Sequence, residues 1–270
     1  MKIPFYDEYF SITSFTPENL DESFKDTYIR NQVIDGNIYK FVAFTDDNVL
    51  NNVKLTMLKD HKFWASYHIY FEDKNEVSRK YNINVVSRET NVPVSIIQNF
   101  FKTVDEMNNI SCFTYAITDD MWAEYANQSN GFCMEFQLLS TNFFFPVVYV
   151  NKKKVDMTND IIQSFKSVSN PLSSNANKKM SILPWVLKDE KYHYENELRF
   201  LCGDEYDDEN GIMGGRIAAG KKKLMGIKGV SYTFEYAGII LKRIHIGANC
   251  TKTYELKHIC DSQNIDVVQW

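Results

Sequence analysis

Strand-like and helix-like segments follow one another along this chain without the regular strand–helix alternation of a parallel sheet. Parallel neighbours need long crossover connections, usually helices, so an irregular order favours antiparallel pairing. With 270 residues, of which 44% are hydrophobic, the chain can bury a sizeable core. We expect a single α+β domain with a mixed, mostly antiparallel sheet and flanking helices, in which residues 1–35 form an N-terminal covering segment and residues 36–270 the core.

Capping residues and helical spacing predict the helices. Thr16-Pro17-Glu18 has the pattern of a helix start, and the Thr45-Asp46-Asp47 and Thr118-Asp119-Asp120 triplets precede two further helices. Residues 77–92 show only a weak pattern. The predicted helices span about 18–31, 48–59, 93–107, a short segment after 118, 159–168, 178–190 with a kink at Pro184, and a segment from about 251.

Aromatic and β-branched runs bounded by turn residues predict the strands. Pro146 within one run indicates an edge strand or a strand start. The predicted strands span 38–44, 62–70, 110–117, 132–136, 143–150, 194–200, 216–219, 222–228, 230–235, 236–246 and 265–269.

Net charge argues against a partner that is held by a global electrostatic field. The chain carries a net charge of −5, which offers no general attraction to nucleic acid or to an anionic membrane. The first residues lack the apolar run of a signal peptide, and no apolar stretch reaches membrane-spanning length. We expect a soluble, cytoplasmic protein.

The five cysteines are odd in number and widely spaced, without a CxxC pair or neighbouring histidines, so we expect reduced thiols and no structural zinc. A cysteine–histidine nucleophile pair stays open, because His68, His193 and His245 all lie in or beside predicted strands. Satisfied core histidines are the plainer interpretation of these three residues.

Residues 188–200 combine dense charge with a strand-like exit. Glu195, Glu197 and Arg199 alternate with apolar residues at a period of two, which predicts one strand face carrying all three. Carboxylates two residues apart on a strand lie roughly 7 Å from each other, and Arg199 would hold Glu197 ionised. The pattern suits acid–base chemistry or ribose binding, and it also suits a solvated strand edge with a surface ion pair.

Common nucleotide and hydrolase motifs are absent from the sequence. It contains no GxGxxG, P-loop, HExxH or GxSxG pattern. Asp119, Asp120 and Glu124 could form an oxygen-rich magnesium site with Glu195 and Glu197. The two aspartates also suit the positive end of a helix, so no metal site is expected.

A series of short motifs carries a family resemblance. In this order they resemble a bacterial domain of unknown function, number 2971, with Val42 standing where the family has arginine. The motifs are Tyr39-Lys40-Phe41, Phe63-Trp64-Ala65-Ser66, Phe71-Glu72-Asp73, Ser111-Cys112-Phe113-Thr114, Met121-Trp122-Ala123-Glu124-Tyr125-Ala126, Gly131-Phe132-Cys133-Met134-Glu135-Phe136, Tyr194-Glu195-Asn196-Glu197-Leu198-Arg199 and Ile244-His245-Ile246-Gly247.

The order of these motifs is similar to that of ADP-ribosyltransferases, which use a basic residue on an early strand, a Ser/Thr-bearing middle strand and a Glu-x-Glu strand. This resemblance implies catalytic roles for Glu197, Glu195 and Ser111. It also implies a small nucleotide ligand as the partner, with NAD as the substrate and no permanently bound cofactor, and it leaves open whether the acceptor is a protein or a nucleic acid. The nucleotide-binding residues would be Lys40, Thr114, Trp122, Tyr125 and Arg199.

Trp122 and Tyr125, three residues apart, are expected to pack over the Ser111–Thr114 strand. The resemblance favours a cytosolic bacterial effector acting on NAD, in stress response or phage defence. The alternatives are a non-enzymatic sensor whose aromatic pocket holds a ligand or partner, and a metal-assisted hydrolase or nuclease.

Overall fold

The fold is taken from a computed structural model, which describes residues 5, 6, 8, 9, 20–66, 80–107, 109–151, 155–166, 182–202, 206, 207, 212, 213, 222–224 and 227–270. Several sequence predictions lie outside these residues: the Thr16-Pro17-Glu18 helix start, His68, the Phe71-Glu72-Asp73 motif and the strand at 216–219.

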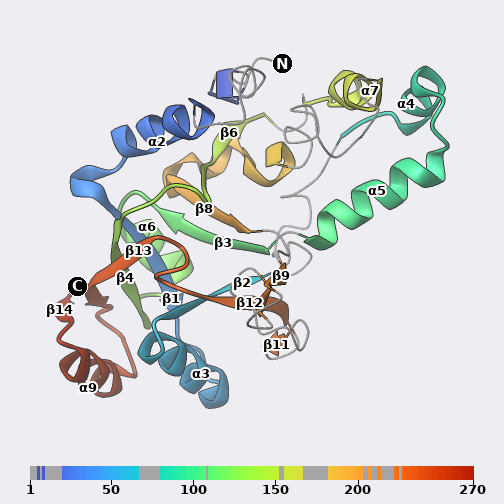
Figure 1. Cartoon of the computed structure of the whole chain (residues 1–270). Helices are drawn as coiled ribbons and strands as arrows, with labels where there is room; N and C mark the ends of the chain where they lie inside the picture. Colours follow the sequence, from blue (N-terminus) through green and yellow to red (C-terminus); the bar gives the residue numbers. More distant parts are fainter. Residues whose placement is uncertain are drawn as a thin grey trace.

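Ten strands of the described residues form one sheet with β3 (Asn109–Thr114) near its centre (Figure 1). Every pairing in it is antiparallel except that of β13 with β14, so the predicted α+β class with a mixed, mostly antiparallel sheet is confirmed. The other strands of this sheet are β1 (Asn37–Ala43), β2 (Lys62–Ser66), β4 (Gly131–Leu138), β5 (Phe144–Pro146), β8 (Glu197–Cys202), β11 (Lys222–Leu224), β12 (Ile227–Thr233), β13 (Ile239–Ile246) and β14 (Asp266–Gln269).

The sheet divides at β3. One edge of β3 pairs along its whole length with β8, from Asn109 to Thr114. The other edge meets β1 only at Thr114 and β2 only at Ile110. One arm therefore continues as β1–β4–β13–β14 and the other as β2–β12–β11. The gap between the two arms, along the edge of β3 from Ile110 to Thr114, is called the fork below.

Helices lie around this divided sheet (Figure 1). Asp47 caps α3 with bonds to Val49 and Leu50, and Thr118 caps α6 through Met121, as the sequence predicted. None of the described helices is long and apolar enough to cross a lipid bilayer. The helices are α2 (Leu20–Gln32), α3 (Asn48–Lys59), α4 (Ile83–Thr90), α5 (Val94–Met107), α6 (Asp119–Tyr125), α7 (Thr158–Lys166) and α9 (Thr253–Gln263).

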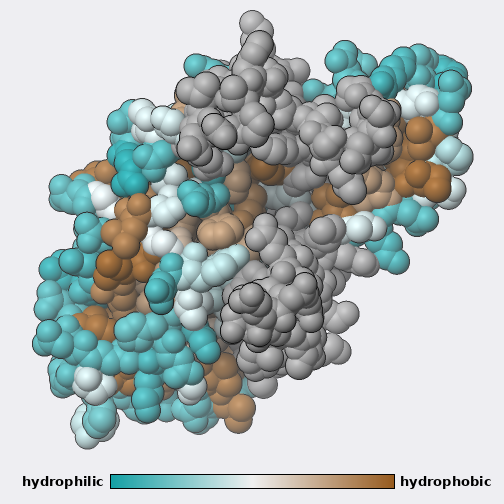
Figure 2. Space-filling view, viewed as in Figure 1, coloured by the Kyte–Doolittle hydropathy of each residue, from teal (hydrophilic) through white to brown (hydrophobic). Residues whose placement is uncertain are grey.

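Two apolar clusters lie on the two faces of the β3–β8 pair. Leu198 and Phe200 alternate into the first, with Phe113 of β3. Leu201 and Ile110 point into the second, which α5 also covers. Figure 2 shows apolar side chains along α5 and a hydrophilic surface around α9. Neighbouring residues of a strand point to opposite faces. The residues of β8 that alternate with Leu198 and Phe200 therefore point towards the second cluster.

Several sequence predictions are wrong in detail. Within the described part of the helix predicted over 178–190, residues 182–186 are helical and the rest is not, because β7 (Leu187–Asp189) then pairs with β6 (Val148–Val150) and the 3₁₀ helix η4 (Glu190–Glu195) follows. The strand predicted over 143–150 is two strands in different sheets, since the Val147 amide donates to the Glu197 carbonyl between them. Helix α4 was missed because it is short and buries only Val86.

Trp122 packs on β1 and β4, whereas the sequence predicted packing over β3. Its ring is 1% exposed, lies 5.1 Å edge-on from Phe41 and 5.7 Å from Trp270, and shares a cluster with Cys133. Helix α6 therefore directs Trp122 towards β1 and β4 and away from the fork.

We predict that Trp122→Ala lowers the free energy of unfolding by about 3–5 kcal/mol, as a large truncation in a core does. Urea denaturation would measure the loss. Tyr254→Ala is the matched control, because Tyr254 is 79% exposed, and it should stay within about 0.5 kcal/mol of the parent. Equal effects of the two changes would contradict the packing described for α6.

Candidate functional site

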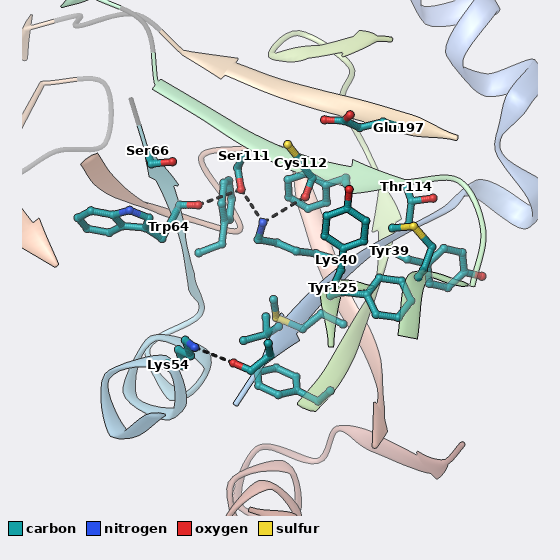
Figure 3. A pocket seen from close by; sticks show the side chains of 18 of the residues that line it. Tyr39, Lys40, Lys54, Trp64, Ser66, Ser111, Cys112, Thr114, Tyr125 and Glu197 are labelled. Atoms are coloured by element: carbon teal, nitrogen blue, oxygen red, sulfur yellow. Dashed lines mark hydrogen bonds between the residues drawn. The ribbon is translucent and has the colours of Figure 1, made fainter. Parts of the chain in front are cut away.

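A pocket of about 900 Å³ occupies the fork between the two arms of the sheet. Its walls come from β1, β2, β3 and β4, with α3, α6, η4 and β8 at the sides (Figure 3). This volume lies in the range of pockets that enclose small molecules. The place where β3 lacks a continuous neighbour therefore opens into this cavity.

Lys40 crosses the fork from β1 to the free edge of β3. Its Nζ donates to Ser111 Oγ at 2.7 Å and to the Cys112 carbonyl at 3.1 Å. Ser111 Oγ in turn donates to the Trp64 carbonyl of β2 at 2.9 Å. Burial lowers the pKa of Lys40, and nearby Cys112 and Glu197 oppose that effect. Lys40 and Ser111 thus join the two arms across the gap (Figure 3).

Lys188 joins two carboxylates on another wall of the pocket. Its Nζ donates to Glu195 Oε2 and, at 3.0 Å, to Glu197 Oε2. Arg199 holds Glu197 from the same strand, with Nε at 2.7 Å from Oε1 and Nη2 at 3.1 Å from Oε2. All four side chains are buried. Two acids and two bases balance one another, which is what such deep burial of charge requires.

The pKa values of the two glutamates are displaced in opposite directions. Burial raises the pKa of both, but Arg199 and Lys188 together hold the pKa of Glu197 well below its usual range. At Glu195 burial outweighs the attraction of Lys188, and its pKa is raised. Glu197 is therefore ionised at neutral pH, whereas Glu195 takes up a proton more readily than an ordinary glutamate.

Glu195 also keeps one oxygen without a hydrogen bond. Within the described part of the chain, Oε1 is buried and has no hydrogen-bond partner, while Glu197 has a cation against each of its oxygens. The Tyr125 hydroxyl lies beside Glu195. Burial, the charge of Glu195 and a hydrogen bond between the two groups raise the pKa of this hydroxyl, and the same bond lowers the pKa of Glu195 in part. Tyr125, 38% exposed, stands between the acid pair and solvent.

Local backbone geometry explains how Glu195 reaches Glu197. Glu195 is the last residue of η4, not a strand residue as predicted, and Asn196 follows in the left-handed conformation with φ 45°. The turn is held by Thr114 Oγ1, which donates to the Glu195 carbonyl at 2.7 Å. Glu197 then opens β8, and its amide donates to the Tyr149 hydroxyl at 2.8 Å.

The fork gathers most of the residues that the sequence singled out. Ser111 and Thr114 both line the pocket but point to opposite faces of β3, so they cannot act from one face together. Arg199 lies behind Glu197 and does not line the pocket, and Trp122 lies outside it. The predicted site residues that do line it are Lys40, Ser111, Thr114, Tyr125, Glu195 and Glu197.

Sequence reasoning missed several lining residues. Lys188 was visible as a charge beside the glutamates, but its pairing depends on η4 folding back, which strand periodicity could not predict. Lys54, Lys62 and Trp64 approach from α3 and β2. Alternation along β2 was the available signal for the last two, since Lys62 and Trp64 share one parity.

The other constellations raised by the sequence have separate positions. No group of three or more His, Cys, Asp or Glu side chains is placed to hold a metal ion among the residues that the structure describes. His245 Nε2 lies 2.8 Å from Glu135 Oε2 and opposite Cys133 in the sheet. Cys133 is fully buried, and burial followed by the Glu135 charge raises the pKa of its thiol, which disfavours the nucleophilic thiolate.

Comparison with known proteins gives one match. The family model described as protein of unknown function (DUF2971) matches residues 121–200. This confirms the resemblance to the domain of unknown function over that segment, and it does not extend to the resemblance to ADP-ribosyltransferases. No curated protein and no solved structure matches the chain. The DUF2971 segment runs from α6 to β8, so it contains Tyr125, Lys188, both glutamates and Arg199, whereas Lys40 and Ser111 lie before it.

We predict opposite pH dependences for two glutamine substitutions. A lowered pKa means that ionised Glu197 stabilises the fold above the unfolded-state pKa of about 4.3, and that this stability is lost as the pH falls towards the folded-state value. Glu197→Gln should therefore cost roughly 3–5 kcal/mol at pH 7 and less below pH 4.3.

Glu195→Gln is the matched comparison. Its raised pKa means that ionising Glu195 weakens folding as the pH rises above about 4.3. This change should therefore cost less at pH 7 than Glu197→Gln does. Urea denaturation from pH 7 to pH 3.5 measures both, and a pH-independent cost for Glu197→Gln would contradict the ion-pair assignment.

Proposed function

We propose that the fork pocket is an active site that cleaves NAD between nicotinamide and ribose and passes the ADP-ribosyl group to an acceptor, as ADP-ribosyltransferases do. One observation carries the proposal: two adjacent carboxylates share Lys188 while their pKa values are displaced in opposite directions. Paired groups with separated pKa values are typical of sites that use one carboxylate as a fixed charge and the other as a proton carrier.

The chemistry assigns a role to each carboxylate. Breaking the bond from ribose C1′ to the nicotinamide nitrogen sends the electron pair to nicotinamide and leaves oxocarbenium character on the ribose. Ionised Glu197 provides a fixed negative charge for that cation. The acceptor then gives an electron pair to C1′, and Glu195 takes its proton. Arg199 and Lys188 act as positioning residues that hold the pair in place.

The remaining pocket residues suit the two ends of such a substrate. Lys40 brings a cation into a largely apolar cavity, where an anionic phosphate would offset the cost of its burial. Tyr125 offers an aromatic face beside the acid pair, where nicotinamide would stack. Thr114, by contrast, already donates to the Glu195 carbonyl, which gives it a structural task.

A second candidate is a binding module without catalysis. The observation that supports it is that Arg199 and Lys188 bind both oxygens of Glu197. The negative charge of Glu197 then serves to stabilise the fold. On this alternative the pocket holds a ligand and does not change it. Nicotinamide release separates the two functions.

We predict that the purified chain releases nicotinamide from NAD and that Glu195→Gln slows release by about 10²–10⁴-fold, the usual contribution of a general base. Chromatographic quantification of nicotinamide measures the rate, with or without an added acceptor. Expression should also slow cell growth if the enzyme depletes NAD, and the same substitution should relieve that effect.

Glu190→Gln is the matched control, because Glu190 is exposed on the same 3₁₀ helix and does not line the pocket. It should leave the rate unchanged. Saturable NAD binding with no nicotinamide release from the parent would overturn the enzymatic proposal in favour of the binding module.

A further inference from the structure

The β2 wall of the fork forms a second, differently charged part of the pocket. Lys62, Trp64 and Ser66, which share one parity of the strand, line the cavity; Phe63 also contacts it although it is only 2% exposed, and Ala65 is fully buried. We infer that this wall binds the purine ring and phosphates of a nucleoside diphosphate, with Trp64 under the ring and Lys62 and Lys54 at the phosphates. The inference deepens the proposed function, on which it rests for the identity of the nucleotide.

Trp64 has the support that a stacking platform needs. Gly229 of β12 lies beneath its ring, and a Cβ at that glycine would be 2.7 Å from Trp64 Cε2 and Cζ2. Ser111 Oγ holds the Trp64 carbonyl from the other side of the fork. The indole is therefore fixed against the backbone of the next strand and also lines the cavity. Stacking on an aromatic side chain is a common way for a protein to hold a nucleic-acid base.

Apart from Lys188, which is paired with the two glutamates, the lysines of the pocket lie on different walls from its acidic residues. Lys40, Lys54 and Lys62 line the side formed by β1, α3 and β2, and within the described residues none of them forms an ion pair with a carboxylate. Every acidic residue of the lining lies elsewhere, on α6, η4 or β8. An anion would therefore settle near the lysines and away from the glutamates.

A bound anion would also stabilise the charged form of Lys54. Its Nζ donates to the Ala43 carbonyl at 2.6 Å, which places the ammonium at the side of the fork between α3 and β1. Burial lowers its pKa, opposed by Asp47. A diphosphate beside it would restore favourable surroundings for the charged form, as phosphate–lysine contacts do elsewhere.

Together these positions orient the substrate. The purine would lie on Trp64, the diphosphate would pass the lysines, and the nicotinamide ribose would reach Glu195 and Glu197. A nucleoside without phosphates should bind weakly because it lacks the contacts with the lysines. A phosphorylated sugar without a base should also bind weakly because it cannot stack on Trp64.

Calorimetric titration of ADP, adenosine and ribose 5-phosphate tests the inference without any catalytic turnover. ADP should bind with the highest affinity and should lose affinity as salt is raised. Trp64→Leu should weaken ADP binding at least tenfold, and Lys62→Gln should weaken ADP but leave adenosine unchanged. Lys59→Gln is the matched control, since Lys59 is exposed on α3 outside the cavity.

Each result separates this inference from the proposed function. ADP binding that depends on Trp64 and Lys62, with no nicotinamide release from NAD, would keep the nucleotide subsite and overturn the transferase. Nicotinamide release with ADP affinity unchanged by both substitutions would overturn the subsite and keep the transferase. Absence of ADP binding to the parent chain would also overturn the subsite. Lys62→Gln decides the outcome if Trp64→Leu fails to fold.

Discussion

The free edge of β3 is the constraint from which the pocket follows. A strand in the middle of a sheet normally pairs along both edges, and unpaired buried backbone groups are costly. Here β1 and β2 each pair with one end of β3, and the ammonium of Lys40 takes the place of a third strand at the Cys112 carbonyl. The sheet can divide here because the Lys40 side chain donates to the Cys112 carbonyl, which would otherwise accept a hydrogen bond from a neighbouring strand.

The acid cluster depends on the opposite edge of the same strand. The continuous pairing of β3 with β8 fixes the positions of Glu197 and Arg199, and the left-handed turn at Asn196 folds Glu195 back beside them. Lys188 closes the group from β7. Such a balanced buried network contributes little net stability compared with an apolar core. Its position in a pocket wall agrees with the role towards a ligand proposed above.

The sequence predicted the local elements well, because periodicity and capping are local properties. The alternation of Leu198 and Phe200 with Arg199, and the caps at Asp47 and Thr118, lie where the patterns placed them. The fork was not predictable, since it depends on which strands share β3. Glu195 was misplaced because a charged strand and a 3₁₀ turn have similar residue patterns, and only the tertiary contact with Lys188 distinguishes them.

In the function proposed above, the fork is where this chain binds its ligand. A crystal structure of the Glu195→Gln variant with NAD tests it most directly. We expect the nucleotide between the two arms of the sheet, with its phosphates on the lysine side and its nicotinamide ribose at Glu197. Ordered NAD anywhere outside the fork, or a fork that stays free of NAD at a concentration that saturates binding in solution, would contradict the claim.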